Sequence, residues 1–141
     1  MNYDALKLEN QLCFPLYACS KEIIRKYTPL LDPLGITYTQ YITLMVLWEE
    51  DNITVKALGA KLYLDSGTLT PLLKKMENQK LIKRLRSSSD ERNVYISLTE
   101  EGRALKEKAS GVPQQIGSCL SLSSKEASSL YQILHKILKQ I

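Results

Sequence analysis

Three thiols and one phenol are the side chains whose types and spacing suggest chemistry in this sequence. Cys13, Tyr17 and Cys19 share a short segment, NQLCFPLYACS, and Cys119 lies far along the chain. A thiolate is the form of cysteine that attacks a peroxide oxygen, and a phenol that donates a hydrogen bond to the sulfur favours that ionised form. Because Tyr17 is one helical turn from Cys13, the two side chains would share a helix face. The segment therefore predicts a thiol that senses an oxidant.

The residues around Cys13 indicate which kind of peroxide it would react with, and the sequence spacing limits which second thiol could form a disulfide with it. Leu12, Phe14 and Leu16 form an apolar surrounding that suits an organic hydroperoxide better than hydrogen peroxide. Attack on the peroxide gives a sulfenic acid, which a second thiol can trap as a disulfide. Cys19 is six residues away, a rise of about 9 Å along a helix, which is too far for a disulfide. We expect Cys19 to be a small buried hydrophobic residue.

Composition excludes several classes of protein. The chain has 141 residues, 44% of them hydrophobic, and a formal net charge of +4, which fits one soluble domain or one protomer of an oligomer. We find no secretion signal and no apolar run long enough to cross a bilayer, so we expect a cytoplasmic protein without a membrane partner. Three irregularly spaced cysteines and a single histidine, His135, predict no disulfide framework, no metal site and no cofactor.

Hydrophobic spacing predicts a long first helix from about residue 4 to residue 27. Pro15 lies inside it and predicts either a kink or a delayed start near Cys13. Pro29, Pro33 and Gly35 predict a loop after this helix.

Three further helices are predicted in the middle of the chain. The first begins after Thr37 or Thr39 and runs to about residue 50, with Leu44, Leu47 and Trp48 buried, and a short one covers 54–61 with Thr54 as its N-cap. The third opens at Asp65 or Ser66 and faces inward with Leu69, Leu72, Leu73 and Met76. Pro71 favours a start nearer Thr68.

Strands and two more helices complete the pattern. Segments 81–86 and 93–98 alternate and are joined by a polar turn, which predicts a two-stranded hairpin with a charged tip. Thr99 caps a helix that begins with two glutamates, and Ser123 with Glu126 forms a capping box that opens the last helix. We therefore predict a mainly α fold with a small β-hairpin, the arrangement of a winged helix-turn-helix domain flanked by amino- and carboxy-terminal helices.

The positive charge is concentrated in the middle of the chain. Residues 56–92 contain nine Lys and Arg and four Asp and Glu, a net +5, whereas the whole chain carries +4. A solvated surface would explain these charges as well, but a helix followed by a basic hairpin predicts major-groove reading by the helix and an arginine in the adjacent narrow groove. The candidate DNA-binding residues are Ser66, Thr68, Thr70, Pro71, Lys74, Lys75, Arg86, Asp90 and Arg92.

The terminal helices predict a homodimer. About half of the helical residues lie outside the winged helix-turn-helix region, at about 36–99, so the apolar stripes of about 1–35 and 100–141 need a surface to cover them. A two-fold dimer built from these helices would place the two winged helix-turn-helix regions, the reading units, about 34 Å apart, which is one turn of DNA. A self-contained monomeric bundle is the alternative.

These residues resemble a known family. LDSGTLTPLLKKME followed by RSSSDERNVYISLTEEG resembles the MarR family of bacterial transcription regulators, and LENQLCFPLY with GITYTQY resembles its organic-hydroperoxide-sensing branch, OhrR and the SarZ type. The resemblance runs from about residue 7 to residue 107. It implies a homodimeric repressor without enzymatic activity, which binds an inverted-repeat operator in double-stranded DNA and releases it when its amino-terminal cysteine is oxidised, with organic hydroperoxides or small thiols as the signal.

The resemblance also implies roles for individual residues. Cys13 matches the sensing thiol, Tyr27 and Tyr38 match tyrosines that hold the sensor sulfur from the other subunit, and Tyr17 matches a nearby tyrosine. Cys119 lies in the region where two-cysteine members carry the resolving thiol, which implies a Cys13–Cys119 bridge between subunits. Pro15 and Cys19 depart from the family pattern.

Other functions remain open on the sequence alone. A MarR-type repressor released by a small aromatic ligand would leave the thiols idle. A thiol peroxidase would turn over peroxide, although no histidine lies near Cys13 and the basic segment would have no purpose. A helical adaptor that only dimerises would show no salt-dependent affinity for DNA.

Overall fold

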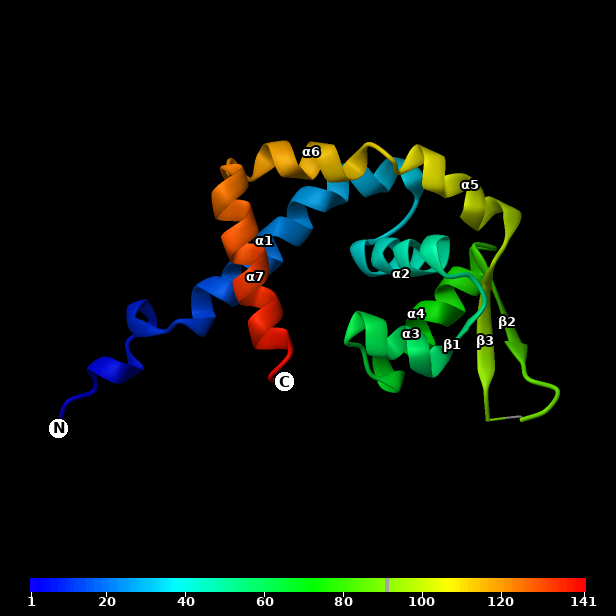
Figure 1. Ribbon diagram of the computed structural model, residues 1–141, viewed down its shortest axis with the longest axis horizontal. Coiled ribbons are helices and arrows are strands. Elements are labelled where there is room, and N and C mark those ends of the chain that lie inside the picture. The colour runs from blue at the N-terminus through cyan, green and yellow to red at the C-terminus, as the bar shows by residue number, and fades with distance from the viewer. Residues whose placement is uncertain (91) are drawn as a thin grey trace. The chain divides into compact units, whose positions relative to one another are not determined.

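The computed structural model describes residues 1–90 and 92–141, which divide into two units, Met1–Ser110 and Gly111–Ile141. The first unit holds most of the helices and a small antiparallel sheet (Figure 1). The second unit holds two helices. The mainly α class predicted from the sequence is confirmed. In the described part of the chain, no helix is long and apolar enough to cross a membrane.

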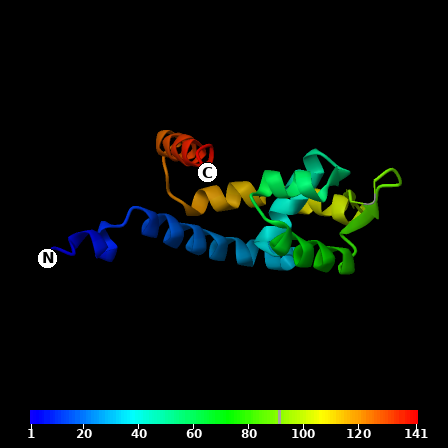
Figure 2. The ribbon, with the colours of Figure 1, turned by 90° about the horizontal axis from the view of Figure 1, so that it is seen from below.

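The amino-terminal segment becomes α-helical only at Cys13. Two short 3-10 turns, Asp4–Leu6 and Leu8–Asn10, precede α1, which spans Cys13–Leu31 and runs as one continuous helix (Figure 2). Of the two outcomes predicted for Pro15, the delayed start is the observed one. Pro15 is the third residue of α1, where its missing N–H removes no helical hydrogen bond. The predicted loop at Pro29 is wrong, because α1 continues through it.

The next segments carry the helix-turn-helix. After the short turn Asp32–Leu34, α2 spans Tyr38–Glu49, α3 spans Val55–Leu62 and α4 spans Ser66–Asn78. The side chains of Thr37, Thr54 and Asp65 accept hydrogen bonds at the three N-termini. The predicted caps are confirmed, and for α2 it is Thr37 rather than Thr39. The later start of α4 suggested by Pro71 is wrong.

The sheet has one strand more than predicted. β2 (Ile82–Arg86) and β3 (Val94–Leu98) form the expected hairpin. A two-residue strand, β1 (Ile53–Thr54), pairs with the other edge of β3. The sheet order is therefore β1-β3-β2, and β1 ties the start of α3 to the base of the hairpin.

The core of the first unit joins α2, α3, α4 and the sheet. The inward stripe of α4 is buried as predicted at Leu69, Leu73 and Met76. Leu44 and Leu47 of α2 are also buried, whereas Trp48 is only half-buried and donates its indole N–H to the carbonyl of Gly102 at 2.9 Å. This packing fixes α4 and the hairpin relative to each other.

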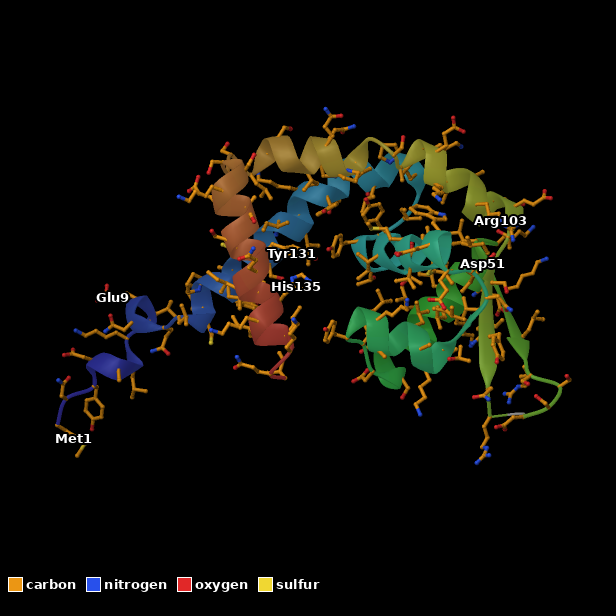
Figure 3. All side chains as sticks on the ribbon, viewed as in Figure 1. Met1, Glu9, Asp51, Arg103, Tyr131 and His135 are labelled. Atoms are coloured by element: carbon orange, nitrogen blue, oxygen red, sulfur yellow. The ribbon has the colours of Figure 1, made fainter. Side chains whose placement is uncertain are left out.

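Helix α5 (Glu100–Lys108) closes the first unit. Thr99 caps it as predicted, and its hydroxyl also donates to the carbonyl of Lys80 at 2.6 Å. Asp51 and Arg103 lie together where α2 ends and α5 begins, with an ion pair at 3.1 Å (Figure 3). α5 is therefore attached to both α2 and the hairpin.

The second unit contains α6 (Val112–Cys119) and α7 (Ser124–Leu138). The Ser123–Glu126 capping box at the start of α7 is confirmed. The sequence reading did not include α6, in which Pro113 occupies the first turn, a position that tolerates proline. On α7, the rings of Tyr131 and His135 stack with centroids 3.9 Å apart (Figure 3).

Candidate nucleic-acid interface and thiol site

The outer face of α4 presents the residue types that read DNA. Ser66, Thr68, Thr70, Pro71, Lys74 and Lys75 are all exposed, while the apolar stripe of the same helix is buried. Thr68 donates its backbone N–H to the Asp65 carboxylate at 2.8 Å, and hydrogen bonding by Thr68 lowers the pKa of Asp65. The cap is thus ionised at neutral pH and fixes the start of the helix.

A groove of about 870 Å³ lies between α3, α4 and the hairpin. Of the sequence candidates, Ser66, Thr70, Arg86 and Arg92 line it. Among its described lining residues, four are basic, Arg84, Arg86, Arg92 and Lys56, and one, Asp65, is acidic. A concave basic surface of this kind attracts the phosphate backbone of a nucleic acid.

The tip of the hairpin orients an arginine. The side chain of Arg92 is 91% exposed, and its Nε donates to the carboxylate of Asp90 at 3.2 Å. The backbone N–H of Arg92 donates to the same oxygen at 3.0 Å, and the Ser87 hydroxyl accepts the N–H of Asp90. Asp90 therefore holds Arg92 from one side, and the guanidinium projects into solvent.

An ion pair connects α4 to the hairpin beneath this surface. The Arg84 guanidinium donates from Nη2 to Glu77 Oε1 at 3.0 Å, and the backbone N–H of Arg84 donates to Oε2 at 3.3 Å. The hydrogen bond from the Arg84 side chain is the main cause that lowers the pKa of Glu77. The Glu77–Arg84 ion pair therefore connects α4 to the hairpin formed by β2 and β3.

We expect Glu77→Gln to lower stability at neutral pH. Because the folded protein lowers the pKa of Glu77, the contribution of the ion pair is present above the unfolded value, about 4.5, and is lost as the pH falls through the lower folded value. The effect is small because the pair is partly exposed. Urea midpoints at pH 7 and pH 3 measure it, and the difference between the wild type and the variant should be smaller at pH 3.

Glu22→Gln is the matched control for this prediction. Glu22 pairs with Arg25 at 3.2 Å on the exposed surface of α1, with both side chains more than half exposed. We expect no change in urea midpoint for Glu22→Gln at either pH. An equal loss in both variants would contradict a specific role for the Glu77–Arg84 pair.

All three thiols are exposed in the protomer. Cys13 is the first residue of α1, Cys19 lies farther along the same helix, and Cys119 is the last residue of α6 in the second unit. The burial expected for Cys19 is therefore wrong, because its side chain is exposed on α1. The spacing predicted between Cys13 and Cys19 holds, since α1 is continuous between them.

Tyr27 and Tyr38 lie together at the other end of α1. Their ring centroids are 4.7 Å apart, and Tyr41, which is buried, packs 5.8 Å from Tyr27. Burial raises the pKa of Tyr27, with further contributions from Tyr38 and Tyr41, and burial raises the pKa of Tyr38. Both phenols therefore keep their protons at physiological pH and can donate hydrogen bonds to an anion.

The tyrosine pair cannot reach the thiol of its own protomer. From residue 13 to residue 27 is 14 residues on one continuous helix, a separation of about 21 Å along its axis. Tyr17, which is exposed, lies one turn from Cys13 and stacks its ring 5.6 Å from the ammonium of Lys21. A contact of Cys13 with Tyr27 and Tyr38 thus requires a second copy of the chain.

Two helices expose apolar surface. On α1, Phe14, Leu16 and Ile24 are 40–45% exposed, and on α7 no residue is buried. The large exposed apolar residues of α7 are Leu130, Tyr131, Ile133 and Ile137, and Ile141 follows after the helix. Exposed apolar surface of this extent is typical of a protein–protein contact.

Several residues that shape the interface were missed in the sequence. Lys56, Tyr63 and Arg84 line the groove, and Gly59 allows α3 to approach α4, since a Cβ there would lie 2.9 Å from the side chain of Leu69. The count of charged residues in the sequence included Lys56 and Arg84 but did not indicate that they line a groove. Glu91, an acid of the hairpin tip, falls outside the described residues.

The sequence is similar to known transcription regulators. A family model described as "Transcriptional regulator SarA/Rot" matches residues 25–109. The organic hydroperoxide resistance transcriptional regulator of Bacillus subtilis is 57% identical over 131 residues, which cover 93% of this chain and 87% of that protein. The regulator SarZ of Staphylococcus aureus is 43% identical over 133 residues, or 94% of this chain and 90% of SarZ.

Solved structures agree with these relatives. Reduced AbfR bound to DNA is 38% identical with a TM-score of 0.79, covering 97% of this chain and 96% of that one. AbfR from Staphylococcus epidermidis has also been solved in a disulfide form, with a TM-score of 0.66 and the same identity over 96% of this chain and 95% of that one. The same winged helix-turn-helix fold therefore occurs in proteins bound to DNA.

Proposed function

Because this chain belongs to the MarR family of transcription regulators, in the branch of OhrR and SarZ, we propose that it is a thiol-based redox switch. It is a DNA-binding transcription regulator. Our proposal is that a homodimer binds an inverted-repeat operator, represses transcription, and releases the DNA when Cys13 is oxidised by an organic hydroperoxide. The relatives named for hydroperoxide resistance and solved as a disulfide support this direction.

The observation that carries the proposal is the arrangement of one exposed thiol and two protonated phenols. Cys13 lies at the amino-terminal end of α1, where unpaired backbone N–H groups favour an anion, and Tyr17 follows one turn later. In a two-fold dimer, Tyr27 and Tyr38 of the other protomer donate their hydroxyl hydrogens to the sulfur. The thiolate is then stabilised without any histidine or metal.

The chemistry proceeds in two steps. The Cys13 thiolate attacks the outer peroxide oxygen, the O–O bond breaks, and the alkoxide takes a proton and leaves as an alcohol. The sulfur is now a sulfenic acid and no longer an anion that accepts two phenol hydrogen bonds. A second thiol, which we assign to Cys119 of the partner, attacks the sulfenic sulfur and expels water, which leaves a disulfide between subunits.

Release follows from the geometry of two linked reading units. Each unit contributes the outer face of α4 to the major groove and Arg92 to the neighbouring narrow groove. The residues that we propose to contact DNA are Ser66, Thr68, Thr70, Pro71, Lys74, Lys75, Arg86, Asp90 and Arg92, with Asp90 acting by holding Arg92. If oxidation moves the units off their one-turn spacing by a few ångström, several of these contacts are lost together.

Arg92→Ala tests the DNA part of the proposal. We expect the affinity for an operator to fall by about 1–3 kcal/mol, and the slope of log affinity against log salt to decrease by about 0.9 for each arginine removed. Fluorescence anisotropy with a labelled duplex at several salt concentrations measures both quantities. Arg25→Ala, an exposed arginine of α1 outside the groove, is the control and should leave both unchanged.

Cys119→Ser tests the bridge. After treatment with an organic hydroperoxide, we expect the wild type to run as a covalent dimer on a non-reducing gel and Cys119→Ser to remain a monomer band. Cys19→Ser is the matched control and should still form the covalent dimer. A covalent dimer in Cys119→Ser would show that another thiol resolves the sulfenic acid.

The experiment that tests the proposal as a whole is a gel-shift titration of the wild type on an inverted-repeat operator. Hydroperoxide should weaken binding, and a thiol reductant should restore it. A second arm uses an aromatic acid in place of the oxidant. Release by the acid alone would favour a ligand-controlled regulator with idle thiols, while many turnovers of peroxide per protein would favour a thiol peroxidase.

A further inference from the structure

Two glutamines connect the beginning of α2 to the carboxy-terminal end of α4, the helix that we propose reads the DNA (the reading helix). Gln40 is 1% exposed, and its Nε2 donates to Oε1 of Gln79 at 2.8 Å. Gln79 is the C-cap of α4, and its own Nε2 donates to the carbonyl of Gly35 at 3.1 Å. A hydrogen-bonded chain thus crosses from one side of α2 to α4.

Gln40 does more than cap its helix. In a capping box, only the side-chain oxygen is needed, and Gln40 Oε1 accepts the backbone N–H of Thr37 at 3.1 Å. The amide nitrogen is left over, and it is used on a residue 39 positions away in the sequence. Because Gln40 is buried, removing Gln79 would leave the Gln40 amide without this hydrogen bond.

The same turn of α2 carries a tyrosine of the proposed thiol site. Tyr38 is the first residue of α2, directly after Thr37, and its ring lies against Tyr27 of α1. The N–H of Tyr41 donates to the carbonyl of Thr37 at 2.9 Å, so the turn moves as one body. A displacement of the Tyr38 ring therefore displaces Gln40 as well.

We propose that Gln40 and Gln79 are positioning residues that transmit the state of Cys13 to the reading helix. This inference rests on the proposed function, because it concerns how the oxidised thiol acts on DNA binding. Gln79 holds the carboxy-terminal end of α4, whose outer face carries Ser66, Thr70 and Lys74. Moving that end tilts the helix in the groove of the DNA, and the contacts along its face change together.

A double-mutant cycle tests the inference. Gln40→Met, Gln79→Met and the double variant replace the amides with apolar side chains of similar length. The readout is the ratio of operator affinities of the reduced and the hydroperoxide-treated protein, at matched salt. We expect each single variant to reduce this ratio by about 2- to 30-fold. The double variant should reduce it no further than the single variants, because one bond is removed in all three.

Further variants separate coupling from stability. Gln79→Glu loses the donation to the Gly35 carbonyl but introduces a carboxylate oxygen that still accepts from Gln40 Nε2, so it should retain most of the wild-type ratio. Gln114→Met, on the exposed surface of α6, is the matched control and should behave as wild type. Labelling of the Cys13 sulfenic acid should proceed equally in all variants. If Gln40→Met fails to fold, the exposed position 79 still decides the question through Gln79→Met and Gln79→Glu.

Each outcome has a definite meaning. A wild-type ratio in Gln79→Met, or losses that add in the double variant, would overturn the inference. Equal losses in Gln79→Met and Gln79→Glu would also overturn it, since the bond from Gln40 is kept in the second. A wild type that shows no response to hydroperoxide would overturn the proposed function instead, and that arm is read before any variant.

Discussion

Organic hydroperoxide is expected to lower the operator affinity of the wild type by about 5- to 150-fold and to leave that of Cys13→Ser unchanged. The serine hydroxyl is similar in size to the thiol but is not oxidised, so the tyrosine contacts of the site keep one arrangement. Because Cys13 is exposed and lies at the first turn of α1, the substitution should not affect folding. A gel-shift or anisotropy titration before and after treatment measures the difference.

Cys19→Ser is the control for this experiment. Cys19 lies on the same helix and is equally accessible to oxidant, yet we expect its loss to leave the response intact. If Cys13→Ser still released DNA on oxidation while Cys19→Ser did not, the sensing role would belong to Cys19. If both variants responded as wild type, the trigger would lie outside α1.

Gly102→Ala is expected to lower the free energy of unfolding by about 3 kcal/mol. A Cβ at Gly102 would overlap the carbonyl oxygen of Leu81 and lie 3.1 Å from the side chain of Leu98. The carbonyl cannot retreat, because it accepts both the backbone N–H and the hydroxyl of Thr99. Since Gly102 also accepts the indole N–H of Trp48, its displacement would disturb α2. Urea denaturation at fixed protein concentration measures the loss.

Gly117→Ala is the matched control for Gly102→Ala. Gly117 lies within α6, and among the described residues nothing comes within 4 Å of a Cβ built there. Alanine in a helix is favoured over glycine by about 0.5–1 kcal/mol, so the control should be unchanged or slightly more stable. Comparable destabilisation in both variants would mean that crowding against Leu81 is not the cause.

Local capping signals in the sequence predicted where several helices begin. Thr54, Asp65 and Thr99 were all identified as N-caps, and each accepts a backbone hydrogen bond from three residues later. The hairpin was predicted within one residue at each strand, since its alternation is a local property. The outer and inner faces of α4 also follow from helical spacing alone.

The incorrect predictions concern features that depend on contacts between residues distant in the sequence, or on exposure to solvent. β1 has only two residues and exists because it pairs with β3, which lies about 40 residues later. Pro29 was predicted to lie in a loop and Pro71 to favour a later helix start, but both lie exposed within helices, so water can satisfy the carbonyls that their rings leave unpaired. Cys19 was predicted to be buried because it lies in an apolar segment. It is exposed because an apolar segment need not be covered by residues of its own chain.

The candidate site was predictable in type but not in arrangement. The sequence identified Cys13, Tyr27 and Tyr38 through a resemblance, and the basic segment through its charge. It could not indicate that Tyr41 packs behind the tyrosine pair, or that Gln40 reaches Gln79. Both contacts join residues whose side chains have no periodic or charge signature. Their roles stay proposals until the variants described above are measured.

The length of α1 makes the proposed switch reciprocal between chains. About 21 Å of helix separates Cys13 from Tyr27 and Tyr38 of its own protomer. Oxidation of Cys13 in one chain would therefore act on the tyrosine pair of the other chain and not on its own. A mixed dimer with a single Cys13 would then loosen first on the half of the operator held by the chain that lacks it. Graded exposure to oxidant would thus yield a half-released intermediate before full derepression.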